Sequence, residues 1–422
     1  MILAISLVFL IGYLLIIFEH KVKIDKAVSA LLAGVICWIL IALSPDSVTE
    51  SGVAVSSILI HHFGEIASIL FFLLGAMTIV ELVDLHHGFD VISQWIKAKN
   101  KWTLLIIISL VTFFLSAVLD NLTTTIVMVS LIRKILSHQE DRFWFAGFIV
   151  IAANSGGAWS PIGDVTTTML WIEHKVSTLQ LIKFLIIPSI LSIAIPIGIV
   201  RFNKRFQQNV ELPEKPKELA SLASKVFLFL GIGLLILVPI IKALTHLPPF
   251  IGMMGALAVI WLISELDLPS LYPPQKDFSK PTVRNALSRI EIPSILFFLG
   301  ILLAISALEV IGQLKVLADF LNNYIQDTAV IALVLGILSA VIDNVPLVAG
   351  AIGMYDLPLD HHFWHELAFA AGTGGSILII GSAAGVAAMG IEKISYQWYL
   401  KRISLLALIG YLTGWVWIYF TI

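Results

Sequence analysis

Ser116–Asn121 reads SAVLDN, and Ser339–Asn344, 223 residues later, reads SAVIDN. Each stretch places a carboxylate and an amide in the middle of a long apolar segment, with no Lys or Arg close by in the sequence. A carboxylate at membrane depth costs at least about 2.5–3.5 kcal/mol unless it is protonated, paired or bound to a cation. The chain carries this costly pair of residues twice, which indicates that the pair has a function in both places.

The composition is typical of a polytopic membrane protein. Of the 422 residues, 59% are hydrophobic and 13% are charged, and the mean hydropathy is +0.98. A soluble domain has about 25% charged residues. The net charge is −2 and no basic face is evident, so we expect no nucleic-acid partner. The first apolar segment lacks a basic n-region and a small-residue cleavage site, so we expect a retained span rather than a signal peptide.

Two kinds of apolar segment are present. Uninterrupted segments are candidate spanning helices, which need about 20 mostly apolar residues; they are 2–18, 27–43, 65–83, 181–200, 224–241, 250–264, 291–308 and 403–421. Segments 102–136 and 328–355 carry the DN pairs in their middles, and each half, about 15 residues long, is short for a full crossing. We predict that these two are re-entrant hairpins. Segments 143–172 and 366–390 contain glycine-rich stretches and predict broken transmembrane helices.

The basic residues predict an orientation. With the N-terminus outside, the loops that fall inside hold the Lys and Arg clusters, at 21–26, 97–101, 133–142, 201–217, 276–289 and 393–402. The loops that fall outside hold few basic residues; they are 44–64, 173–180, 243–249, 309–327 and 356–365. Residues 50–64 are a candidate amphipathic surface helix. We predict an integral membrane protein of the bacterial inner (plasma) membrane, with both termini outside.

The two halves of the chain resemble each other at three places in the same order. EIASILFFL from Glu65 matches EIPSILFFL from Glu291, the SAV motifs match, and NSGGAWSPIG from Asn154 aligns with GTGGSILIIG from Gly372, at offsets of 226, 223 and 218. The predicted orientation sends the matching segments in opposite directions, and inverted repeats with broken helices are typical of secondary transporters. The fold class predicted is an all-α polytopic membrane protein with two inverted-topology repeats, 1–205 and 224–422. A cytoplasmic linker, 206–223, joins them.

Hard oxygen ligands are concentrated at the interruptions. They are supplied by Asp120, Asn121, Thr123, Thr124, Ser155, Asp164, Thr166, Asp343, Asn344, Thr373 and Ser382. Such ligands suit Na⁺ or Li⁺ rather than soft metals, which prefer Cys and His. The sequence shows no basic partner for Asp120, Asp164 or Asp343 at these depths. An acid that holds either a proton or a metal cation makes the two mutually exclusive, which is the minimum requirement for cation/proton antiport, with no cofactor.

Structural roles are the alternative for several of these residues. A membrane-embedded Asp can cap a broken helix or hold a hydrogen bond between helices. Histidine pairs and a triplet, at 61–62, 86–87 and 361–365, are predicted to lie at membrane edges or in loops. There they are interfacial polar groups or, alternatively, pH sensors, because His titrates near neutrality.

At these residues the chain resembles the NhaD-type Na⁺/H⁺ antiporters of the ion transporter superfamily, which also includes arsenite permeases and citrate or dicarboxylate carriers. The resemblance rests on the two SAV motifs and on NSGGAWSPIGDVTTT. It implies exchange of Na⁺ or Li⁺ for protons and a homodimer. It also implies cation ligands at Ser116, Asp120, Asn121, Asp164, Thr166, Ser339, Asp343 and Asn344, with Na⁺ itself at the three acids and two amides. The halves differ, because Ser382 follows Gly381 where Asp164 follows Gly163, so the site is expected to be asymmetric.

Two other functions are less well supported by the residues. A Na⁺-coupled carboxylate or oxyanion carrier of the same fold would favour neutral hairpin tips or a basic residue for the anion, and here both tips are acidic. A membrane-embedded enzyme would use Asp120 and Asp343 as a carboxylate pair. The sequence contains neither H-E-x-x-H nor G-x-S-x-G. We therefore expect a transporter and not an enzyme.

Overall fold

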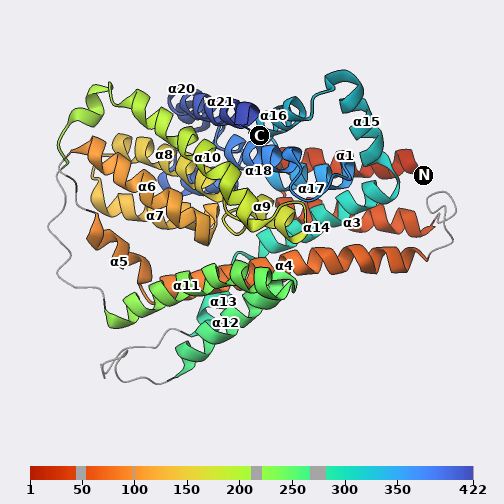
Figure 1. Cartoon of the computed structure of the whole chain (residues 1–422), viewed down its shortest axis with the longest axis horizontal. Helices are drawn as coiled ribbons and strands as arrows, with labels where there is room; N and C mark the ends of the chain where they lie inside the picture. The colour runs from red at the N-terminus through yellow and green to blue at the C-terminus, as the bar shows by residue number, and fades with distance from the viewer. Residues whose placement is uncertain (44–53, 97, 99, 211–220, 267–281, 422) are drawn as a thin grey trace.

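The computed structural model describes residues 1–43, 54–96, 98, 100–210, 221–266 and 282–421, and its regular elements there are helices (Figure 1). In chain order these are α1 (Ile2–Ile17), α2 (Glu19–Val22), α3 (Lys26–Leu43), α4 (Val55–Leu85), α5 (Gly88–Trp95), α6 (Lys101–Leu119), α7 (Asn121–Ile135), α8 (Gln139–Ala158), α9 (Val165–Ile172), α10 (Thr178–Val200), η2 (Lys204–Gln207), α11 (Leu222–Thr245), α12 (Pro249–Glu265), α13 (Val283–Arg289), α14 (Ile292–Val310), α15 (Gln313–Ile325), α16 (Thr328–Leu338), α17 (Asn344–Met354), α18 (His362–Gly374), α19 (Ala383–Glu392), α20 (Tyr396–Arg402) and α21 (Ser404–Thr421).

The predicted class, an all-α polytopic membrane protein, is confirmed. Among the described residues seven helices are long and apolar enough to cross a membrane, namely α3, α4, α6, α10, α11, α14 and α21. Shorter apolar helices include α1, α12, α17 and α19. Large apolar side chains are exposed on the outer helices, with Leu3 73%, Leu405 65% and Phe420 80% accessible. Such surfaces are suited to lipid rather than water.

One prediction about the loops was wrong, and one helix was not predicted. Residues 55–64 do not form a separate surface helix, because α4 runs unbroken from Val55 to Leu85; residues 50–53 lie outside the described part. The predicted outer loop 309–327 contains helix α15, which is bent by 113° from α16. Leu314 and Ala318, four residues apart, are the buried side chains of α15. The exposed side of α15 is apolar as well, with Val316, Phe320 and Tyr324 each more than half exposed.

The predicted interruptions are present. In the first half α6 and α7 meet at Asp120 and contact each other (Figure 1), and the chain breaks between Ala158 of α8 and Val165 of α9. In the second half residues 339–343 separate α16 from α17, and residues 375–382 separate α18 from α19. The two predicted hairpins differ in packing, because α6 and α7 both pack on α8, whereas α16 packs on α18 and α17 packs mainly on α14, α9 and α15. Their re-entrant form stays a prediction, and α6, at 19 residues, is longer than expected and long enough to cross a membrane.

The same close contact occurs in both halves. Gly156 in α8 lies so near α6 that a Cβ would overlap the carbonyl oxygen of Phe113. Gly374 in α18 lies equally near Gly336 of α16. The glycines are 218 residues apart and their partners 223, which are the offsets of the sequence repeat. Each interrupted helix is therefore held against the hairpin of its own half, while the opposite direction of the two halves and their domain limits stay predictions.

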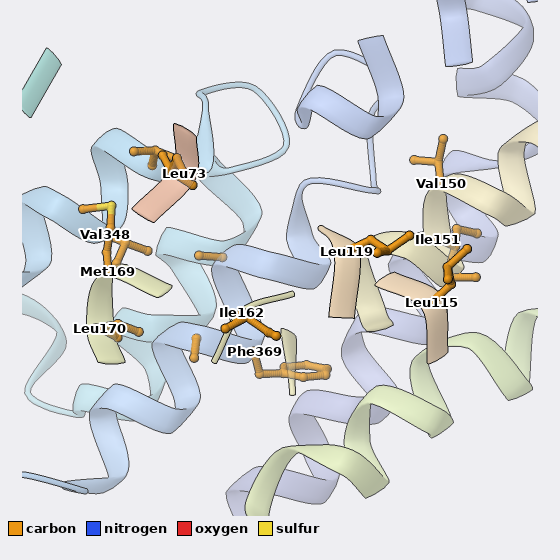
Figure 2. Close-up of a cluster of buried hydrophobic side chains, with 14 of the residues drawn as sticks. Leu73, Leu115, Leu119, Val150, Ile151, Ile162, Met169, Leu170, Val348 and Phe369 are labelled. Atoms are coloured by element: carbon orange, nitrogen blue, oxygen red, sulfur yellow. The ribbon is translucent and has the colours of Figure 1, made fainter. Parts of the chain in front are cut away.

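A second close-packed pair, α3 and α14, lies beside these elements. A Cβ on Gly34 of α3 would lie 2.6 Å from the carbonyl oxygen of Gly300 in α14, so only glycine fits there. The buried side chains otherwise form a continuous apolar core. Figure 2 shows two groups of them, one where α6 meets α8 (Leu115, Leu119, Val150, Ile151) and one where α9 meets α17 (Met169, Leu170, Val348).

Ion pairs join the helix ends that carry the basic clusters. The Asp141 carboxylate, only 4% exposed, accepts from Lys101 at 2.7 Å and from Arg205 at 2.9 Å. Arg142 at the start of α8 pairs with Glu392 at the end of α19 at 2.9 Å. Elements of the first half and of the second half are therefore joined at this end of the molecule.

Candidate functional site

The first hairpin turns at Asp120, whose backbone has a φ of +107°. Positive φ is uncommon for a side chain other than glycine, and Asp tolerates it better than most. Its carboxylate caps α7, accepting from the Thr123 amide at 2.7 Å and from the Thr123 hydroxyl at 2.9 Å. The acid therefore lies at the positive end of the α7 dipole, which stabilises its charge.

A chain of buried hydrogen bonds, here called the polar cluster, connects Asn121, Asn154, Asp164 and Ser382. The Asn121 amide donates to Asp164 Oδ2 at 2.8 Å and to Asn154 Oδ1 at 3.0 Å. The Asn154 amide donates to Ser382 Oγ at 2.9 Å. Asp164 Oδ1 also caps α9, accepting from the Thr166 amide at 3.0 Å. The exposed fraction of the four side chains is at most 6%.

The polar cluster brings together three interruptions that are far apart in the sequence. Asn121 comes from the hairpin, Asp164 follows the break after α8, and Ser382 follows the break after α18. Asn154 links them, and it was missing from the predicted ligands although it begins the quoted motif. Its partner in the repeat alignment is Gly372, so comparison of the two halves gives no polar pair at this position.

The prediction that Asp343 has no basic partner was wrong. Lys26 Nζ lies 3.3 Å from Asp343 Oδ2 and donates a hydrogen bond to it. Asp343 Oδ1 caps α17, accepting from the Val345 amide at 3.2 Å. Lys26 is 317 residues away in the sequence, in a loop predicted to lie inside, so hydropathy and spacing gave no sign of the pair.

Several predicted ligands lie apart from the polar cluster. The Ser116 and Ser339 hydroxyls donate to the carbonyls of Ala153 and Ala371, which are equivalent positions of the repeat. They hold each hairpin to its broken helix. Ser155 accepts from Ser192 of α10, and Thr373 donates to the carbonyl of Phe369 within α18.

Thr124, Thr166 and Asn344 also place their side-chain oxygen atoms near the breaks. Thr124, in the first turn of α7, is fully buried, and within the described residues its hydroxyl has no hydrogen-bond partner. Thr166 is fully buried at the start of α9, and Asn344 is 6% exposed at the start of α17. These positions leave the three residues available as ligands in addition to the polar cluster.

A cavity of about 760 Å³ reaches the site from one end of α14. Its lining includes Asp343, Ser382 and Lys26, together with Leu122 of the first hairpin and Glu291 at the start of α14. A second cavity, of about 590 Å³, lies at the other end of α14 and is lined by His61, His62, Glu65, Glu173 and Glu309 among others. Among the described residues, the first cavity reaches the polar cluster at Ser382, and the second is lined by no residue of the cluster.

The helices, the paired interruptions and the oxygen-lined site define a polytopic membrane transporter. Residues 13–374 match the family model described as "Citrate transporter", and the chain belongs to this family. The prediction of a transporter rather than an enzyme is supported by this membership.

Curated relatives extend the assignment. The chain is 46% identical over 416 residues to "Sodium/proton antiporter 1" of Arabidopsis thaliana, which covers 97% of this chain and 71% of the relative. It is 43% identical to "Sodium/proton antiporter 2" of the same plant, covering 97% of each chain. It is 31% identical to "Na(+)/H(+) antiporter NhaD" of Alkalimonas amylolytica, covering 93% of this chain and 84% of the relative. The predicted resemblance to NhaD-type antiporters is confirmed.

Proposed function

We propose that this protein exchanges Na⁺ or Li⁺ for protons across the membrane. The observation that carries the proposal is the polar cluster, in which one buried carboxylate, two amides and a hydroxyl from both halves meet at the helix breaks. These hard oxygens are suited to alkali cations, and no resident cofactor is needed. The names of the plant and bacterial relatives support the same activity.

Competition between proton and cation follows from the surroundings of two acids, of which Asp164 is buried and Asp120 is partly exposed. In the part of the chain that the structure describes, Asp120 and Asp164 accept hydrogen bonds from amide and hydroxyl groups and form no ion pair. Each acid must therefore be protonated or neutralised by a bound cation when water is excluded. We assign cation binding to Asp164 and Asn121, with Asp120, Asp343 and the nearby threonines supplying further oxygens as the ion moves.

The open cavity indicates the direction of access. It lies at the end of α14 where Arg289 and Glu291 are found, and the basic residues predict that this end faces the cytoplasm. We assign the structure to an inward-open state. We further assign the protein to an energised membrane such as the bacterial plasma membrane, with both termini outside and two copies forming a homodimer. Cysteine accessibility at the termini and cross-linking in the membrane test these assignments.

Transport in everted vesicles tests the function. Respiration acidifies the interior, and a fluorescent dye reports the pH gradient. Added Na⁺ or Li⁺ should collapse the gradient at alkaline pH, and Asp164→Asn or Asp120→Asn should abolish the response at equal expression. An inserted, stable wild-type protein without any cation response would refute the proposal.

The alternative, a Na⁺-coupled carboxylate carrier, is favoured by one observation, the Lys26 ammonium in the open cavity. Lys26 is already paired with Asp343, however, and the other acids that line the cavity, Glu19, Asp25 and Glu291, would repel an organic anion. Uptake of citrate or succinate that depends on Na⁺ would support this alternative.

A further inference from the structure

The Lys26–Asp343 ion pair lies on the wall of the open cavity. The nitrogen and oxygen atoms are 3.3 Å apart, and the two side chains are 32% and 22% exposed. Lys26 Nζ also lies 4.4 Å from the ring centroid of Phe297 in α14, within range of a cation–π interaction. The ammonium is therefore held between a carboxylate and the buried face of an aromatic ring, and Lys26 and Asp343 both line the cavity.

The pair joins two different parts of the molecule. Lys26 begins α3, which is fixed to α14 through the close approach of Gly34 and Gly300. Asp343 belongs to the break between α16 and α17 and lines the same cavity as Ser382 of the polar cluster. A cation that enters the cavity therefore meets a carboxylate already occupied by a cation from the protein itself.

We propose that Lys26 is a positioning residue that competes with the transported cation for Asp343, an inference that rests on the proposed antiport. Without Na⁺, the ammonium neutralises Asp343, so that the empty carrier does not leave an unpaired carboxylate in the cavity. Arrival of Na⁺ displaces the ammonium toward the Phe297 ring. Release of Na⁺ restores the ion pair between the α3–α14 pair and the second hairpin.

Apparent Na⁺ affinity in everted vesicles tests this competition. The quantity measured is the Na⁺ concentration that gives half-maximal collapse of the pH gradient (K0.5), at alkaline pH where protons compete least. Lys26→Gln should lower K0.5 about threefold to tenfold, because a partly screened ion pair no longer competes. Lys26→Arg restores the charge and offers two donors to the carboxylate, so K0.5 should be equal to or above the wild-type value.

Coupling and control variants make the outcome specific. In an Asp343→Asn background Lys26→Gln should have no further effect on K0.5. Lys23→Gln removes the same charge from an exposed position three residues away and should leave K0.5 unchanged. An unchanged or raised K0.5 in Lys26→Gln, or an equal effect without Asp343, would overturn the inference while wild-type antiport stands. Absence of antiport in the wild type would overturn the proposed function as well.

Discussion

Replacing Asn154 by alanine tests whether the polar cluster binds the transported cation. The change removes two buried hydrogen bonds, one from Asn121 at 3.0 Å and one to Ser382 at 2.9 Å. Asn121 keeps its bond to Asp164, and Ser382 keeps its bond from the Gly385 amide. One buried N–H of the Asn121 amide is left without its partner, so the loss is about 1–3 kcal/mol in total.

If the cation relies on this geometry, the same free energy should appear in K0.5. A loss of about 1–3 kcal/mol corresponds to a rise of about 5- to 150-fold, measured in everted vesicles at matched expression. Ser155→Ala is the matched control, because it removes a buried bond to Ser192 next to the site without touching the cluster. It should lower the melting temperature and leave K0.5 unchanged. A wild-type K0.5 in a stable Asn154→Ala protein would refute the assignment of the cluster.

Three further predictions concern stability, measured as melting temperature in detergent. Gly156→Ala should be destabilising by several kcal/mol, because its Cβ would overlap a backbone carbonyl, whereas Gly198→Ala, with open space around it, should gain about 0.5–1 kcal/mol. A small effect at Gly156 would contradict the close packing. Burial is the main cause that raises the pKa of Glu173 from 4.5 to about 7. The folded state then holds a proton that the unfolded state has lost, so stability falls as pH rises through this range. Glu173→Gln should remove that fall, with a gain above neutrality and little change near pH 5; equal gains at both pH values would contradict it. Arg142→Ala leaves the 4% exposed Glu392 with a weaker partner and should cost about 1–3 kcal/mol, and Glu392→Gln in the same protein should recover part of it.

The sequence was sufficient for the class, the spanning helices and the positions of the interruptions. Long apolar segments and the SAV motifs are local signals, and the spanning helices other than α4 begin and end within a few residues of the predicted limits. Where local signals were weak, the prediction failed. The start of α4 contains two histidines, and these polar residues suggested a separate surface helix. It contains few residues that interrupt a helix, so α4 continues without a break. Helix α15 was missed because Lys315, Asp319, Asn322 and Asn323 interrupt its apolar residues, so the segment was assigned to a connection between spans.

The sequence indicated individual residues of the candidate site, but it did not indicate which of them contact each other. Asp120, Asn121 and Asp164 are conspicuous because polar groups are costly in apolar segments. Their partners depend on how distant helices pack. The Lys26–Asp343 pair joins residues 317 positions apart, and Asn154 meets Ser382 across 228 positions. Sequence spacing also does not show which way a hydroxyl points, and for that reason Ser155 was grouped with the ligands although it bonds to α10.

The glycine contacts at Gly156 and Gly374 limit how this transporter can change its access. With backbone in direct contact, neither hairpin can hinge away from its broken helix as a separate gate without losing that contact. We expect α6 and α8 to move together, and α16 and α18 likewise. A change of access on the far side would then require these paired helices to be displaced as units.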